Sequence, residues 1–184
     1  MKSFFGLCTA GLALWATPAP VAGAGITYNC DTAADHFSEL VLPSAEPAFV
    51  VSGTVQLRAL ARSKTYVPLA RIQIASSSAP GKSPQAFAGF SLSAVATDAK
   101  KTSSEAIQML SYNASGREDE TLPLSLMVKP GTVQAFKLSY DGSQVTVNLG
   151  NEAKSFPLKT GEPVVRIICS TGEFLFTDLT IKRQ

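Results

Sequence analysis

The sequence predicts an all-β protein, a single antiparallel β-sandwich or jelly roll. Hydrophobic residues alternate with polar ones in short segments, turn signals recur about every 8–12 residues, and helical spacing is never sustained over a dozen residues. The segment 133–150 shows the pattern best, because Phe136, Leu138 and Tyr140 alternate with polar neighbours before an Asp-Gly turn at 141–142 and a second alternating arm. This pattern predicts a hairpin, with either a two-residue or a four-residue loop.

Length and composition agree with one folded domain. The chain has 184 residues, of which 45% are hydrophobic and 16% charged, with a formal net charge of +2. This composition supplies a core and excludes a disordered chain. No run of Lys or Arg is longer than the pair at 100–101, so the basic stripe of a nucleic-acid-binding protein is missing.

Residues 1–24 have the pattern of a cleaved export signal. Lys2 precedes an apolar run from Phe4 to Ala16, and the small residues at 22–24 suit signal peptidase. The run is shorter than the about 20 residues of a membrane-spanning helix. We therefore expect a signal peptide at 1–24 and a secreted or periplasmic domain at 25–184, with no membrane span in the mature chain.

Removing that segment changes the cysteine inventory. Cys8 leaves with the signal, so Cys30 and Cys169 are the two cysteines of the mature domain. In an oxidising compartment such a pair predicts one disulfide, the alternative being two buried free thiols. The bond would join the first strand to one of the last.

From residue 25 the chain reads as strands and loops. Asp31 to Asp35 suggests one helical turn, and Gly53 marks an expected bulge in a long strand. Polar segments at 76–85, 97–106 and 113–121 read as loops. Besides the hairpin, we expect strands at 26–30, 37–42, 49–61, 66–75, 87–95, 107–112, 122–128, 164–169 and 174–181.

Two segments carry a resemblance to a known family. The run 136–142, followed by a Val-x-Val strand, and the cysteine-bearing final pair 168–176 resemble the hairpin and closing strands of concanavalin A-like (laminin-G-like) jelly rolls. The resemblance implies that the first and last strands share a sheet. The family includes sugar-binding lectins, glycan hydrolases and adhesion modules, so it does not select a function. Its glucanase motif Glu-x-Asp-x-x-Glu is absent, and Glu173 and Asp178 have the wrong spacing.

The residues that catalysis requires are sparse. His36 is the single histidine and reads as a turn or surface residue, and no Gly-x-Ser-x-Gly elbow occurs. The triplet 81–83 imitates the end of a phosphate-binding loop, but Ser76 replaces its glycine and Pro84 stands where its helix should start. We therefore predict no catalytic residue and no cofactor.

Metal binding and glycosylation have weak signals. The acidic run 118–120 beside Asn113 offers oxygen ligands for calcium, although such runs usually form solvated loops. We predict no metal ligand. Asn113-Ala114-Ser115 also fits an N-glycosylation acceptor.

Aromatic residues suggest where a ligand would bind. Trp15 leaves with the signal, so the mature chain must use tyrosine wherever a sugar packs on an aromatic face. Tyr66 and Tyr112 adjoin polar loops, so we expect these two tyrosines to be exposed, and with Arg117 they form the predicted ligand-binding set. Tyr140 belongs to the hairpin's core row.

Together these patterns predict an exported, non-catalytic binding or envelope-associated module, whose partner is a glycan or an envelope protein rather than nucleic acid. The alternatives are a glycan-active hydrolase using an Asp/Glu pair and a structural protein that docks on a partner protein. Exposed aromatic residues in a hollow would favour sugar binding, paired carboxylates in a cleft would favour hydrolysis, and a smooth apolar patch would favour a protein partner.

Overall fold

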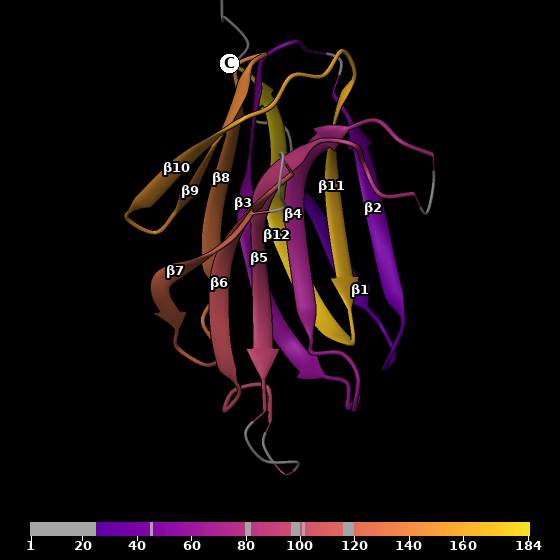
Figure 1. Cartoon of the computed structure of the whole chain (residues 1–184). Helices are drawn as coiled ribbons and strands as arrows, with labels where there is room; N and C mark the ends of the chain where they lie inside the picture. The colour runs from indigo at the N-terminus through magenta and orange to yellow at the C-terminus, as the bar shows by residue number, and fades with distance from the viewer. Residues whose placement is uncertain (1–24, 45, 80–81, 97–99, 101, 116–119) are drawn as a thin grey trace, which may run out of the picture.

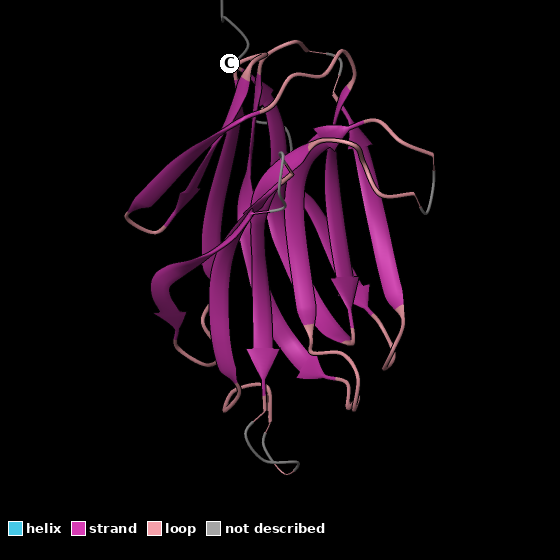
Figure 2. Ribbon diagram, viewed as in Figure 1, coloured by secondary structure: helices cyan, strands magenta, loops and turns pink. Residues whose placement is uncertain are grey.

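The computed structural model describes residues 25–44, 46–79, 82–96, 100, 102–115 and 120–184, with the backbone alone described at 120–128. These residues form twelve strands and no helix (Figures 1 and 2). The described part therefore contains no helix long and apolar enough to cross a membrane. The strands are β1 (Ile26–Asp31), β2 (Phe37–Pro43), β3 (Phe49–Leu60), β4 (Leu69–Ser76), β5 (Phe87–Val95), β6 (Ile107–Ala114), β7 (Glu120–Val128), β8 (Gln134–Tyr140), β9 (Gln144–Leu149), β10 (Glu152–Pro157), β11 (Pro163–Ser170) and β12 (Gly172–Arg183).

The strands form two six-stranded sheets packed face to face (Figure 1). Sheet A has the order β1-β12-β3-β8-β9-β10, and sheet B has the order β2-β11-β4-β5-β6-β7. Neighbouring strands are antiparallel throughout. The predicted all-β sandwich is confirmed, and the first and last strands do share a sheet.

The predicted hairpin is β8 and β9, closed by the pair Tyr140 and Val145, so its loop has four residues. The carboxylate of Asp141 accepts the backbone N–H groups of Ser143 and Gln144 at 2.8 and 2.9 Å. These hydrogen bonds stabilise the charged carboxylate and lower the pKa of Asp141 to about 2. Gly142 supplies the positive φ, 96°, that the turn requires.

The core fills the space between the sheets with the inward row of each strand. Phe90 of β5 and Phe136 of β8 meet across this space with ring centroids 5.3 Å apart. Alternate residues along β4, Ala70, Ile72 and Ile74, are fully buried. Period-two alternation therefore predicted which face of these strands is buried, because successive side chains point to opposite faces.

The predicted disulfide is present between Cys30 and Cys169, with Cα atoms 6.4 Å apart. Cys30 lies on β1 in sheet A, and Cys169 lies on β11 in sheet B. The bond therefore links the two sheets, whereas β1 forms its backbone hydrogen bonds with β12. It holds the edge strand β1 to the opposite layer of the sandwich.

Several local details differ from expectation, among them β10, which the alternation did not predict, and β4, which begins at Leu69 rather than at 66. The residues at 31–35 form a turn without a helix, with Asp35 at a φ of 62°. The extra residue of the expected bulge lies in β12 rather than at Gly53, because Thr177 and Thr180 pair with Thr54 and Ser52. Gly53 faces this irregularity, where an added Cβ would lie 3.0 Å from the carbonyl oxygen of Thr177.

A cleft at one end of the sandwich

A cleft of about 560 Å³ opens where β3 and β5 end and β4 begins. Its floor is apolar and includes the end of β3 at 59–61 and the end of β5 at 94–96. The β3–β4 connection forms a wall that carries Tyr66 and Val67, which are 59% and 48% exposed. Apolar walls around a few polar groups are typical of small-ligand sites.

Hydrogen bonds hold this wall in place. The Ser63 hydroxyl accepts the backbone N–H groups of Thr65 and Tyr66 at 2.9 and 3.0 Å and donates to a carboxylate oxygen of Asp35 at 2.5 Å. Farther along the cleft, the Ser103 hydroxyl donates to the Arg58 carbonyl oxygen at 2.7 Å. The backbone that presents Tyr66 is therefore held before any ligand binds.

The turn between β11 and β12 supports the cleft from behind. Ala61 donates its N–H to the Thr171 carbonyl oxygen at 3.3 Å. A Cβ added to Gly172 would lie 2.9 Å from the Ala59 carbonyl oxygen and 3.4 Å from the Pro68 Cβ, and both of these residues line the cleft. Cys169 of the disulfide lies on β11 just before this turn.

Arg62 adds one strong hydrogen-bond donor group. Its side chain is exposed and forms no hydrogen bond or ion pair with any residue that the structure describes. A guanidinium offers five N–H donors in a planar fork. Among the described lining residues there is no Asp, Glu, His or Cys, so they provide no acid/base pair. The exposed guanidinium can donate hydrogen bonds to a polar ligand in the cleft.

The structure separates the three predicted ligand-binding residues. Tyr66 lies in the cleft and is exposed as expected, whereas its role in binding stays a prediction. The expectation that Tyr112 is exposed is wrong, because this side chain is 5% exposed and packs against Phe156 with ring centroids 5.9 Å apart. Strand β6 continues to Ala114 and places Tyr112 in its inward row. Arg117 lies outside the described residues.

The surroundings of Tyr112 also change its acidity. Burial raises the pKa of the Tyr112 hydroxyl, and the negative charge of Glu152 raises it further. Tyr140, expected in the core, is 1% exposed and donates its hydroxyl to the Gly142 carbonyl oxygen at 3.1 Å. His36, expected at a turn or on the surface, is exposed.

The metal and glycosylation hypotheses gain no support. No group of three or more His, Cys, Asp or Glu side chains able to hold a metal ion occurs among the described residues. Residues 118 and 119 of the acidic run lie outside that part of the chain. Asn113 is 5% exposed and accepts a hydrogen bond from the Gln73 amide at 2.8 Å, so it is a poor acceptor for a glycan in the folded state.

The sequence reasoning missed Arg62 and Val67 as residues of the cleft. Both belong to the same connection as Tyr66, between two strands of strong alternation. The polar run from Arg62 to Thr65 directly before Tyr66 was the available signal. The sequence did not show that the end of β5 lies across the cleft from this run.

The fold has relatives among solved structures. An alginate lyase from Alteromonas sp. 272 matches with a TM-score of 0.56 at 9% identity, covering 90% of each chain. The carbohydrate-binding module CBM66 from Bacillus subtilis matches with a TM-score of 0.51 at 9% identity, covering 87% of this chain and 97% of that one. A fructosyltransferase from A. japonicus matches with a TM-score of 0.53 at 14% identity, covering 88% of this chain and 26% of that one.

No protein-family model matches the sequence, and no curated protein matches it. The structural matches share the jelly-roll β-sandwich, which confirms the resemblance to concanavalin-like jelly rolls at the level of fold. At such low identity the likeness shows the fold alone.

Proposed function

We propose that the mature chain is an exported, non-catalytic carbohydrate-binding module that holds a saccharide in the cleft at the end of the sandwich. The observation that carries this proposal is the exposed Tyr66 side chain in a cleft that Arg62 also lines and whose described lining has no carboxylate. Tyr66 supplies the flat face and Arg62 the donors.

Each part of the cleft matches a part of a sugar. The C–H face of a pyranose packs on an aromatic ring, and its hydroxyl groups accept hydrogen bonds from a guanidinium. A volume of about 560 Å³ lies within the roughly 300–1,000 Å³ of typical ligand sites. The Ser63 hydrogen bonds reduce the ordering cost of binding, because they hold the Tyr66 backbone in advance.

Two further observations support a glycan over other ligands. The structural neighbours include an alginate lyase and a carbohydrate-binding module, so this fold suits both polysaccharide cleavage and polysaccharide binding. The described lining of the cleft lacks the paired carboxylates of a glycoside hydrolase. The described lining therefore favours binding over hydrolysis by a carboxylate pair.

Export is part of the proposal. The disulfide between Cys30 and Cys169 is of the kind that persists in oxidising compartments. The signal-peptide pattern at 1–24 points to the same compartments. Polysaccharides of envelopes and extracellular matrices are accessible there.

The test uses the mature chain on an array of microbial and plant polysaccharide fragments, followed by calorimetry on a ligand that binds. We expect Tyr66→Ala to weaken binding by about tenfold, the size of a lost aromatic contact, and Tyr66→Phe to retain most of it. Arg62→Ala should weaken binding by a similar factor. Val133→Ala removes an exposed apolar residue outside the cleft and serves as the control.

Two results would count against the proposal. Full-strength glycan binding by both Tyr66→Ala and Arg62→Ala would remove the cleft as the site. Release of new reducing ends or unsaturated products from a bound polysaccharide would replace binding by catalysis.

A further inference from the structure

A second hollow lies on the outer face of sheet B, away from the cleft. It has a volume of about 220 Å³ and is lined by outward residues of β2, β11, β4 and β5 and by part of the β4–β5 connection. The cations of its described lining are Arg71, Lys82 and Arg166, and the single carboxylate is Glu39. Its position and charge are independent of the cleft that carries the proposed function.

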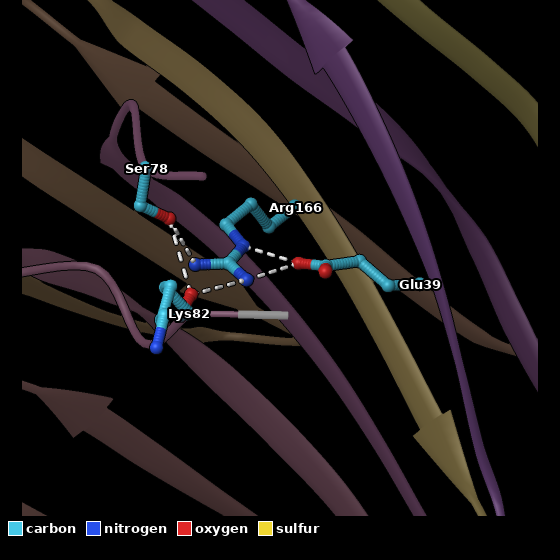
Figure 3. Close-up of polar contacts among 4 residues, drawn as sticks. All are labelled: Glu39, Ser78, Lys82 and Arg166. Carbon is cyan, nitrogen blue, oxygen red and sulfur yellow. Dashed lines mark hydrogen bonds and ion pairs between the residues drawn. The ribbon is translucent and has the colours of Figure 1, made fainter. Parts of the chain in front are cut away.

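Arg166 builds one side of this hollow. The residue is 5% exposed, and its guanidinium forms an ion pair and a hydrogen bond with Glu39 of the neighbouring strand (Figure 3). Two further N–H groups donate to the Ser78 hydroxyl at 3.1 Å and to the Lys82 carbonyl oxygen at 3.2 Å. One buried side chain thus joins β11, β2 and the β4–β5 connection.

These contacts determine whether the positive charges of Arg166 and Lys82 remain available to a ligand. Glu39 offsets the charge of Arg166, and Arg166 uses the backbone of Lys82 rather than its side chain. The Lys82 ammonium is exposed and has no polar partner among the described residues. The backbone of Lys82 is therefore held in place while its charge stays free to meet a ligand.

The rest of the lining limits the kind of ligand. Gln73 is 1% exposed and is oriented by its hydrogen bond to Asn113, so a fixed amide contributes to the polar floor. Phe37, which is 67% exposed, and Phe87 supply aromatic surface. A bare inorganic ion would leave these rings without a partner, whereas a sugar ring has an apolar face for them and can carry an oxyanion for Lys82.

We infer that this hollow binds one anionic sugar unit of a polysaccharide, with its carboxylate or sulfate directed at Lys82 and its ring against Phe37. A volume of 220 Å³ is below the roughly 300–1,000 Å³ of sites that enclose drug-sized ligands and suits one ring. The charge also distinguishes this site from the cleft, where the sugar contacts one aromatic ring and one guanidinium.

The experiment measures binding of the mature chain to polygalacturonate, dextran sulfate and neutral dextran by calorimetry at low and high salt. We expect an acidic polymer to bind, neutral dextran to bind more weakly, and added salt to weaken acidic binding, because exposed charges are screened. The two acidic polymers distinguish the sources of the oxyanion. Binding of polygalacturonate alone identifies a uronate, and binding of dextran sulfate alone identifies a sulfated sugar.

The decisive variant is Lys82→Ala, which removes the ammonium and keeps the carbonyl oxygen used by Arg166. We expect acidic binding to weaken by about tenfold, equivalent to ~1.4 kcal/mol. Lys137→Ala is the matched control, because Lys137 is exposed on the outer face of sheet A. Melting curves of both variants establish that they fold.

Several outcomes would overturn the inference. Equal weakening by Lys82→Ala and Lys137→Ala would show a general charge effect without a site. Loss of acidic binding in Tyr66→Ala but not in Lys82→Ala would place the oxyanion in the cleft, so the cleft would stand and this site would fail. The reverse pattern would support the sheet-face site and show that the acidic polymer does not depend on the cleft. Failure of both acidic polymers to bind would also refute the inference of an anionic-sugar site on sheet B.

Discussion

Removal of the disulfide is the sharpest test of how this fold is stabilised. Cys30 and Cys169 are separated by 139 positions, so the bond closes most of the chain into a loop. In the chain-entropy treatment, a loop of this length stabilises the folded state by about 5 kcal/mol, because the unfolded chain loses freedom when it is cross-linked. Such a value is a large fraction of the 5–15 kcal/mol typical of a whole domain.

The expected change in melting temperature follows from the size of the domain. Unfolding of about 160 residues carries an entropy of about 340 cal/mol/K, so a loss of 5 kcal/mol lowers the melting temperature by about 15 °C. Both cysteines are at most 1% exposed, so substitution also removes two buried sulfur atoms. The double variant Cys30→Ala/Cys169→Ala should therefore melt at or below the temperature of the reduced wild type.

The assay is thermal unfolding followed by circular dichroism, with and without reductant, supported by urea titration at 25 °C. Reductant should destabilise the wild type and leave the double variant unchanged. Far-ultraviolet spectra should show that both still form sheet. A loss of less than about 1 kcal/mol on removing the bond would refute the reasoning, because β1 would then be held to the sandwich by its pairing with β12 alone.

Two further predictions concern charged groups. The pKa of Asp141 falls to about 2 in the folded state, below the roughly 3.9 of an unfolded aspartate, so its stabilising contribution is present above pH 4 and is lost as the pH falls toward 2. The melting temperature of Asp141→Asn should therefore fall less than that of wild type between pH 5 and pH 2, and identical slopes would contradict this. The Arg166 and Glu39 side chains are 6% and 14% exposed. Glu39→Gln should lower the free energy of unfolding by about 3 kcal/mol, because it leaves the buried Arg166 charge without its partner. The double variant Arg166→Met/Glu39→Met removes both charges and should lower the free energy of unfolding by much less. Urea titration measures both, and equal losses would show that the ion pair itself supplies the stability.

The local pattern of alternating hydrophobic residues and turn residues was sufficient to predict much of the fold. Alternation at Phe136, Leu138 and Tyr140 predicted one buried row, and the Asp-Gly pair predicted the turn that closes the hairpin. Two cysteines in a domain that the sequence predicts to be exported predicted the disulfide. These features depend on period-two geometry and on compartment chemistry, both of which the sequence expresses directly.

The candidate sites depend on contacts between segments that are far apart in the chain, and the sequence does not show these contacts. Tyr112 appeared to border a loop, and its burial follows from the pairing of β6 with β5 through Ala114. Arg166 and Glu39 are 127 positions apart, and they meet because β11 pairs with β2 in sheet B. The sequence by itself determined most of the strands, most of their buried faces and the cysteine pair, because each follows from neighbouring residues or from composition. Only the tertiary structure decided which strand ends enclose a cleft and which charges meet on a sheet face, because strand order is set by packing between segments far apart in the chain.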